Sequence, residues 1–163
     1  YYGREKIYML KKLIEVTSDH EFKFKVIYPS SIYGKNQEGN MFLPTLLRHI
    51  KERKKMFAYG SQKKRDFINV KDVANFLKDL ITNYPAFKSD HIFINSGRLI
   101  SLKDISKKIC NLKGLNLSEV ISFEDSVEDL DDFQLIDKEY IEEDLFMPKT
   151  SLEKGIRSMF LDA

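Results

Sequence analysis

The sequence holds a single cysteine, so the chain cannot close an internal disulfide. Disulfides are common in secreted proteins and rare in reducing compartments, and we therefore expect a cytoplasmic location. The cysteine, Cys110, lies in a stretch whose apolar residues recur at helical spacing. This setting predicts a buried and chemically inert thiol.

The sequence also lacks long apolar runs, metal-ligand patterns and a strong charge imbalance. No apolar run approaches the length of a membrane span, and no signal peptide opens the chain, so we expect no membrane partner. The three histidines (His20, His49, His91) have no carboxylate or thiol at ligand spacing, so we expect no metal site. A net charge of +2 does not indicate a nucleic-acid partner.

Glycine is scarce as well. The seven glycines include no Gly-x-Gly-x-x-Gly or Gly-x-x-Gly-x-x-Gly series after an expected strand. That series forms the turn that cradles the pyrophosphate of a dinucleotide cofactor at a helix N-terminus. The residues of this chain therefore do not supply such a cradle.

Helical periodicities and short apolar runs alternate along the chain, which indicates an α/β or α+β protein. We predict helices at residues 3–16, 42–53, 72–82, 101–112 and 151–160, and strands at residues 22–28, 56–58, 66–70, 91–95 and 120–123. Pro29 would stop the first strand, residues 30–40 would form a loop, and Asp72 would cap the third helix. The carboxylates between Glu124 and Asp132 predict an acidic loop.

Tyr2 and Lys6 are four residues apart and therefore share one face of the first predicted helix. A nearby ammonium favours phenolate and lowers the tyrosine pKa from its ordinary value, as a general base working near neutral pH requires. Spacing alone does not single out this pair, because Tyr8, Tyr59 and Tyr84 also stand four residues before a lysine.

Arg65 stands just before a predicted strand, in the stretch that runs from Tyr59 to Ala74. A guanidinium offers a rigid fork of donors that suits phosphate oxygens. A surface salt bridge with one of the chain's many acids is the alternative for Arg65. We expect structural roles for Asp66, as a turn anchor, and for Asp72, as the helix cap.

The order of these segments resembles the extended short-chain dehydrogenase/reductases, the NAD-dependent sugar epimerases and dehydratases. The resemblance rests on Tyr2-Gly3-Arg4-Glu5-Lys6, on Pro29-Ser30-Ser31-Ile32-Tyr33-Gly34, on the arginine-strand-helix stretch around Arg65, on Phe93-Ile94-Asn95-Ser96-Gly97 and on the closing helix after Met147. The chain departs from the family where Tyr28 replaces an arginine and Ser31 an asparagine. The acidic stretch also replaces a turn that carries a second phosphate-binding arginine.

The resemblance implies a role for each matching residue. Tyr2 would exchange a proton with a sugar hydroxyl, and Lys6 would tune Tyr2 and hold the cofactor ribose. Pro29 would lie beside the nicotinamide of NAD or NADP. Ser31 and Arg65 would bind the diphosphate of a nucleotide-sugar substrate. The implied activity is that of an epimerase, dehydratase or reductase, and thus of an isomerase, lyase or oxidoreductase.

The implied fold is α/β: the C-terminal part of a Rossmann-like parallel sheet plus a small α/β substrate-binding lobe. Residues 1–40 would hold the end of the Rossmann-like region with the catalytic helix, and residues 41–163 would form mainly the lobe. The family places a glycine-rich turn and a catalytic Ser or Thr before the tyrosine. We therefore expect the isolated chain to be inactive, with a missing N-terminal half or a second copy as its partner.

A protein of another class remains the alternative. The chain could be a non-catalytic module, derived from this family, that binds a sugar nucleotide or a protein. A fold cut before Tyr2 would expose sheet edge and apolar surface, which favours association. A glycine-rich β-α-β unit encoded upstream in frame would indicate an enzyme, whereas a true start near Tyr1 would indicate a module.

Overall fold

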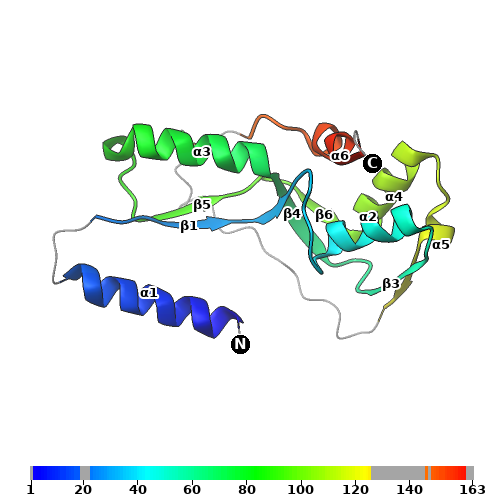
Figure 1. Cartoon of the computed structure of the whole chain (residues 1–163), viewed down its shortest axis with the longest axis horizontal. Coiled ribbons are helices and arrows are strands. Elements are labelled where there is room, and N and C mark those ends of the chain that lie inside the picture. Colours follow the sequence, from blue (N-terminus) through cyan, green and yellow to red (C-terminus); the bar gives the residue numbers. More distant parts are fainter. Residues whose placement is uncertain (1, 19–22, 126–145, 147, 161–163) are drawn as a thin grey trace.

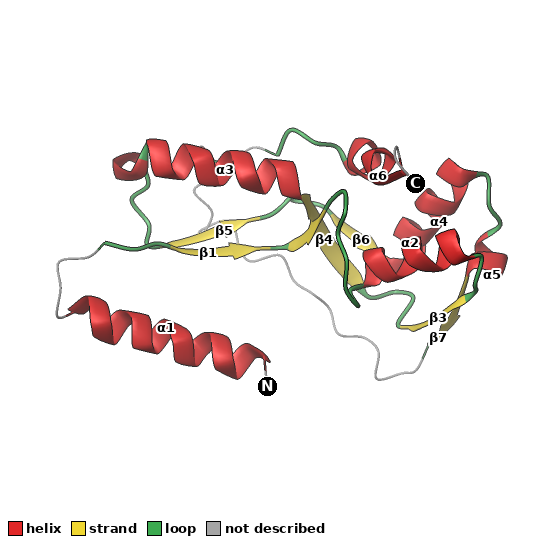
Figure 2. Ribbon diagram, viewed as in Figure 1, coloured by secondary structure: helices red, strands yellow, loops and turns green. Residues whose placement is uncertain are grey.

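The computed structural model describes residues 2–18, 23–125, 146 and 148–160 (Figures 1 and 2). The elements in chain order are α1 (Tyr2–Ser18), β1 (Val26–Pro29), β2 (Ser31–Tyr33), α2 (Phe42–Glu52), β3 (Met56–Tyr59), β4 (Lys64–Asn69), α3 (Val70–Thr82), the 3₁₀ turn η1 (Tyr84–Ala86), β5 (His91–Ile94), β6 (Leu99–Ser101), α4 (Leu102–Lys113), α5 (Leu117–Val120), β7 (Ile121–Glu124) and α6 (Leu152–Phe160).

Three of the four strand pairs among the described residues are parallel. β1 pairs with β5, β2 with β4 and β3 with β7 in parallel, while β6 pairs with β4 in the antiparallel sense. Parallel neighbours need crossover connections, and helices such as α2 and α3 lie on these connections. The mixture of helices with parallel pairs confirms the predicted α/β class.

The described elements form two groups joined by β4 (Figure 1). α3 covers one face of the β1–β5 pair, whereas α2, α4, α5 and α6 gather around β3, β7 and the end of β4. Each group has its own buried core. One core includes Leu46, Ile105 and Ile156, and the other includes Phe76, Ile92 and Ile94.

Neighbouring residues of β4 connect the two cores. Phe67 belongs to the core around α2, α4 and α6, while Ile68 belongs to the core beneath α3. Successive side chains of a strand point to opposite faces, so one strand can serve both cores. The position of β4 therefore determines how both groups pack.

α1 lies apart from the other elements (Figure 2). Its exposed apolar side chains are those of Ile7, Tyr8, Met9, Leu13, Ile14 and Val16. A single helix is marginally stable in water, and helices in proteins gain most of their stability from packing an apolar face. Association of the chain through exposed apolar surface stays a prediction. The division of the chain at residue 40 also stays a prediction.

The predicted helix cap at Asp72 is wrong. Asn69, the last residue of β4, caps α3 by accepting a hydrogen bond from the Lys71 backbone N–H at 3.0 Å. The helix follows the strand without a loop, so the strand's last side chain reaches the first free N–H groups. Asp72 instead accepts from the backbone N–H groups of Lys149 (3.2 Å) and Thr150 (3.0 Å). It thereby fixes the segment before α6 to α3.

Other local predictions need correction in their bounds. β1 begins at Val26 and includes Pro29, which pairs in register with Ile94, and residues 31–33 form β2 within the expected loop. β6 and the four-residue α5 were not predicted. Elements of three or four residues hold too little of a repeat for periodicity to detect them.

The prediction for Cys110 agrees with the structure, and Ser101 caps the helix that carries it. The Ser101 hydroxyl caps α4 by accepting from the Asp104 backbone N–H at 3.0 Å. Cys110 is buried in the first core, and burial raises the pKa of its thiol. A thiol of this kind stays protonated and is a poor nucleophile. The acidic loop, by contrast, lies mostly outside the described residues.

Asp66 is buried and anchors two turns, as predicted. Its Oδ1 accepts hydrogen bonds from Ser30 Oγ (2.5 Å) and the Ser96 backbone N–H (2.8 Å). Its Oδ2 accepts from Ser96 Oγ (2.8 Å) and the Arg98 backbone N–H (2.9 Å). One carboxylate on β4 thus holds both the segment after β1 and the segment after β5.

We expect Asp66→Asn to lower the free energy of unfolding by about 2–4 kcal/mol. The NH2 group of asparagine would replace one carboxylate oxygen, and it cannot accept hydrogen bonds from the donors around it. Those donors would be buried without an acceptor, at a cost of about 1–3 kcal/mol each. Chemical denaturation measures this loss. Asp79→Asn is the matched control, because the exposed Asp79 side chain takes part in no hydrogen bond or ion pair among the described residues and should change stability little. Equal losses in the two variants would contradict the anchoring role.

We expect Gly155→Ala to destabilise the chain by about 1–3 kcal/mol, the usual cost of overpacking. Gly155 is buried in α6, and a Cβ there would overlap the Tyr33 hydroxyl and lie 2.8 Å from the Asn69 amide nitrogen. Gly3→Ala is the control, because a Cβ on Gly3 in α1 meets nothing within 4 Å. Thermal unfolding compares the two, and a Gly155→Ala variant as stable as wild type would show that α6 can move away from β2.

Candidate functional site

A cavity of about 260 Å³ lies between the first turn of α2 and the strands β2 and β4. Two residues predicted to bind substrate, Ser31 and Arg65, both line it. Its other lining residues are Ile32, Gln37, Met41, Phe42, Leu43, Pro44, Phe67 and Leu102. The fold therefore brings together side chains that are 34 positions apart in the sequence.

Strand register explains why Ser31 and Arg65 meet. β2 pairs with β4 so that Ser31 lies opposite Phe67, and Arg65 precedes Phe67 by two residues on the same strand. Side chains two residues apart on a strand share a face, and paired residues of neighbouring strands do so too. Ser31, Phe67 and Arg65 thus point to one side of the sheet.

Arg65 supplies the positive charge of this cavity. It is half-buried, and its Nη1 donates a hydrogen bond to the Lys64 carbonyl oxygen at 2.8 Å. A guanidinium has five N–H donors in a planar fork, a geometry that matches the oxygens of a phosphate or a carboxylate. Its place on a paired strand limits its freedom and favours binding of a phosphate or a carboxylate.

The N-terminus of α2 adds a second feature that favours anions. Phe42 and Leu43, the first residues of the helix, line the cavity, and the N-cap residue Met41 makes no capping hydrogen bond through its side chain. The first backbone N–H groups of a helix have no partner within it and attract negative charge. Together with Arg65, this helix end suits a phosphate group.

Gln37 is a polar residue of the cavity that sequence analysis missed. Its Nε2 donates to the Ile32 carbonyl oxygen at 3.0 Å, while its Oε1 is buried without a hydrogen-bond partner among the described residues. A buried acceptor that lacks a partner is unfavourable, so a donor on a bound ligand would stabilise it. No local pattern marks Gln37, because it lies in a loop.

The predicted catalytic and cofactor-binding residues lie elsewhere. Tyr2 begins α1, but its side chain lies outside what the structure describes. Lys6 is exposed one turn later in α1, and Pro29 is exposed at the end of β1. Neither Lys6 nor Pro29 lines the cavity that holds Ser31 and Arg65.

Tyr33 is a buried tyrosine that directly follows Ser31 and Ile32, two lining residues of the cavity. Burial raises the pKa of its phenol, a hydrogen bond with Asn69 lowers it, and the charge of Asp72 raises it, with a net rise. A phenol whose pKa is raised stays protonated near neutral pH and cannot act as a base. Tyr33 is therefore a packing residue beneath α6.

Within residues 2–18, 23–125, 146 and 148–160, no three His, Cys, Asp or Glu side chains come together as metal ligands would. In that same part of the chain, every helix is too short or too polar to cross a bilayer.

A family model described as "NAD dependent epimerase/dehydratase family" matches residues 1–94, which is more than half of the chain. The matched residues run from α1 to β5 and include every lining residue of the cavity except Leu102. A comparison with curated proteins gives no match.

Solved structures of sugar-nucleotide enzymes share the fold. UDP-glucose 4-epimerase from Thermotoga maritima, solved with UDP-glucose, has a TM-score of 0.76 and 20% identity over 97% of this chain and 51% of its own. UDP-glucuronic acid 4-epimerase from Bacillus cereus, solved with UDP-glucuronic acid and NAD, has a TM-score of 0.74 and 19% identity over 92% and 48%.

A dehydratase gives a similar result. dTDP-glucose 4,6-dehydratase from Bacillus anthracis, solved with NAD, has a TM-score of 0.71 and 18% identity over 88% of this chain and 45% of its own. Identities this low show the fold alone. The chain spans about half the length of these structures.

Proposed function

The chain belongs to the NAD-dependent epimerase/dehydratase family, and we propose that it forms the substrate-binding part of an enzyme that acts on a nucleotide-sugar. The observation that carries this proposal is the shared cavity of Ser31 and Arg65. Enzymes solved with UDP-glucose and UDP-glucuronic acid have the same fold, which supports a substrate of that class. The reaction would be an epimerisation, a dehydration or a reduction.

The diphosphate is the part of the substrate that this cavity would hold. Its volume of about 260 Å³ is below the roughly 300–1,000 Å³ of sites that enclose a drug-sized ligand. The nucleoside and the sugar would therefore extend beyond it. Arg65 and the first turn of α2 would bind phosphate oxygens, and the Ser31 hydroxyl would donate one further hydrogen bond.

Gln37 and Phe67 would orient the groups beside the diphosphate. The free Oε1 of Gln37 would accept a hydrogen bond from a sugar hydroxyl or an N–H of the base. Phe67 offers an apolar wall on the same face of β4 as Arg65. A polar contact beside an apolar wall is the usual composition of a small-molecule site.

We assign the chemical step to Tyr2, as the group that exchanges a proton with the substrate. Lys6 lies four residues further along α1, where its ammonium would favour the phenolate and could donate to ribose hydroxyls. NAD, when bound, would supply the hydride acceptor. In this proposal Lys6 would hold the cofactor ribose and Pro29 would lie beside the nicotinamide, whereas the sequence has no glycine-rich turn for the pyrophosphate.

We expect Arg65→Ala to weaken binding of UDP-glucose or dTDP-glucose by about 1.5–3 kcal/mol, the contribution of hydrogen bonds to charged groups. Arg65→Lys should recover only part of the affinity, because an ammonium cannot form the bidentate fork. Added salt should weaken wild-type binding, since part of the attraction is Coulombic. Calorimetric titration measures all three effects.

The exposed neighbour gives the matched control for Arg65. Lys64→Ala removes the same charge from the same strand but from a side chain that does not line the cavity. It should leave affinity within a factor of about two. If Arg65→Ala lowers the melting temperature and leaves affinity unchanged, Arg65 is a structural residue and the diphosphate site is lost.

We expect Tyr2→Phe to lower turnover by roughly 100-fold or more, because acid–base transfer by a positioned side chain contributes about that factor. The measurement uses the longest form of the enzyme that binds NAD. Tyr8→Phe is the control, since Tyr8 is an exposed tyrosine of the same helix with a lysine at the same spacing. Equal losses in both variants would show that Tyr2 is not the proton-transfer group.

A further inference from the structure

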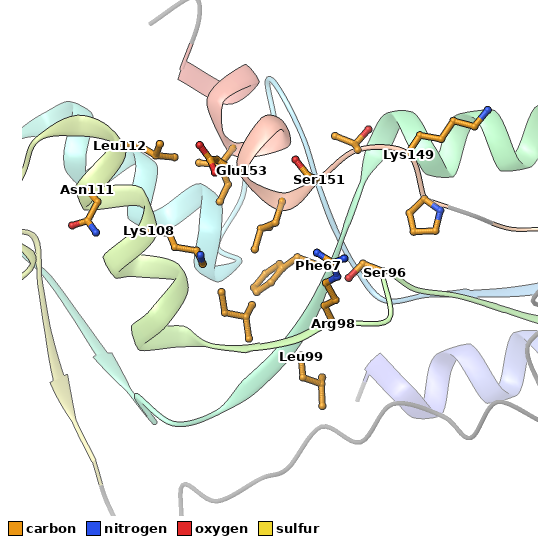
Figure 3. A pocket seen from close by; sticks show the side chains of 15 residues that line it. Phe67, Ser96, Arg98, Leu99, Lys108, Asn111, Leu112, Lys149, Ser151 and Glu153 are labelled. Carbon is orange, nitrogen blue, oxygen red and sulfur yellow. The ribbon is translucent and has the colours of Figure 1, made fainter.

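A second and larger cavity, of about 790 Å³, lies between α4, α6 and the paired strands β4 and β6 (Figure 3). It shares only Phe67 with the cavity that holds Ser31 and Arg65. Its volume falls in the range of sites that enclose a small organic ligand. Apart from Phe67, no side chain that surrounds it takes part in the proposed nucleotide-sugar site.

Two cations face this second cavity without a counter-charge. Among the described residues, neither the Arg98 guanidinium nor the Lys108 ammonium takes part in an ion pair or a hydrogen bond. The carboxylate in the lining, Glu153, is bonded to Arg157 on its own helix at 2.9 and 3.1 Å. Lys149 also contributes to the lining, but its side chain extends away from Arg98 and Lys108 in Figure 3.

Both cations are attached to fixed backbone. The Arg98 N–H donates to the buried Asp66 carboxylate at 2.9 Å, directly after a turn in which Gly97 has a φ of 73°. Lys108 lies in the middle of α4, whose N-terminus is capped by Ser101. A fixed backbone limits the positions that each cationic group can reach, which favours a defined binding site.

The remaining walls are largely apolar. Phe67 and Leu99 come from the strands, Leu112 from α4, and Leu152 and Ile156 from α6. Figure 3 shows Phe67, Leu112 and Lys108 around the same space below α6. Figure 3 shows Lys108 and Arg98 on either side of Phe67, so positive charge borders the apolar surface at two places. Such a lining repels a metal cation and does not suit a small hydrated anion. It suits an anion with an apolar body.

We propose that this cavity binds an amphipathic organic anion, with its carboxylate, sulfonate or phosphate group between Arg98 and Lys108 and its apolar body against Phe67, Leu112 and Ile156. The charged group would form charge-assisted hydrogen bonds with both cations. The apolar body would displace water from surface that is otherwise wetted, which is favourable in proportion to its area. This site is separate from the proposed substrate site and does not rest on it.

The test uses 1-anilinonaphthalene-8-sulfonate, a fluorescent aromatic anion, titrated into the purified chain. We expect saturable binding at one site, weakened about tenfold or more for each cation removed in Arg98→Gln/Lys108→Gln. The matched control is Lys103→Gln/Lys107→Gln, which removes two exposed charges of α4 that do not line the cavity. Arg65→Ala should also leave the probe's affinity unchanged.

A neutral probe separates charge from apolar contact. N-phenyl-1-naphthylamine lacks the sulfonate and should bind the wild type and the Arg98→Gln/Lys108→Gln variant equally. Arg98 and Lys108 are exposed, so both variants should keep the wild-type melting temperature. Equal weakening of the anionic probe in the control pair, unchanged affinity in the cavity pair, or no saturable binding at all would overturn the proposal.

Discussion

The carboxylate of Asp66 accepts four hydrogen bonds in a part of the fold where the chain changes direction twice. Its donors are the Ser30 hydroxyl, both donors of Ser96, and the backbone of Arg98. These groups belong to the segments that leave β1 and β5, which are themselves paired in parallel. A buried carboxylate is tolerable only with such a set of donors, and the requirement fixes both segments onto β4. Any displacement of β4 would leave these donors unpaired.

This constraint places two cavities on the same framework. On one side of β4, the register with β2 brings Ser31 beside Arg65 and Phe67. Beyond Phe67, the anchored turn at residues 96–98 directs Arg98 to the second cavity. Phe67 lines both. The arrangement thus supports a diphosphate site and a separate anion site. The buried Asp66 side chain holds the segments after β1 and β5 in place for both.

The helix with the proposed catalytic pair is held differently. α1 exposes most of its apolar side chains and lies apart from the two cores, whereas the substrate cavity is built into the sheet. The family model nevertheless spans both parts in one continuous match. The chain covers about half of the length of the related solved structures. The substrate side is the part whose geometry can be tested on the chain by itself.

The sequence determined the features that depend on local order. Helical spacing predicted α2, α4 and α6, the alternation of elements predicted the α/β class, and the segment order indicated the family. Arg65 and Ser31 were found by motif and resemblance. Only the tertiary structure decided what depends on register and long-range contact: that these two line one cavity, that Gln37 joins them with a free acceptor, and that Asp72 binds Thr150 while Asn69 caps α3. Ser31 and Arg65 are 34 positions apart, and Asp72 and Thr150 are 78 positions apart, so each pair meets only through strand pairing and packing. Local sequence patterns do not predict contacts over such separations.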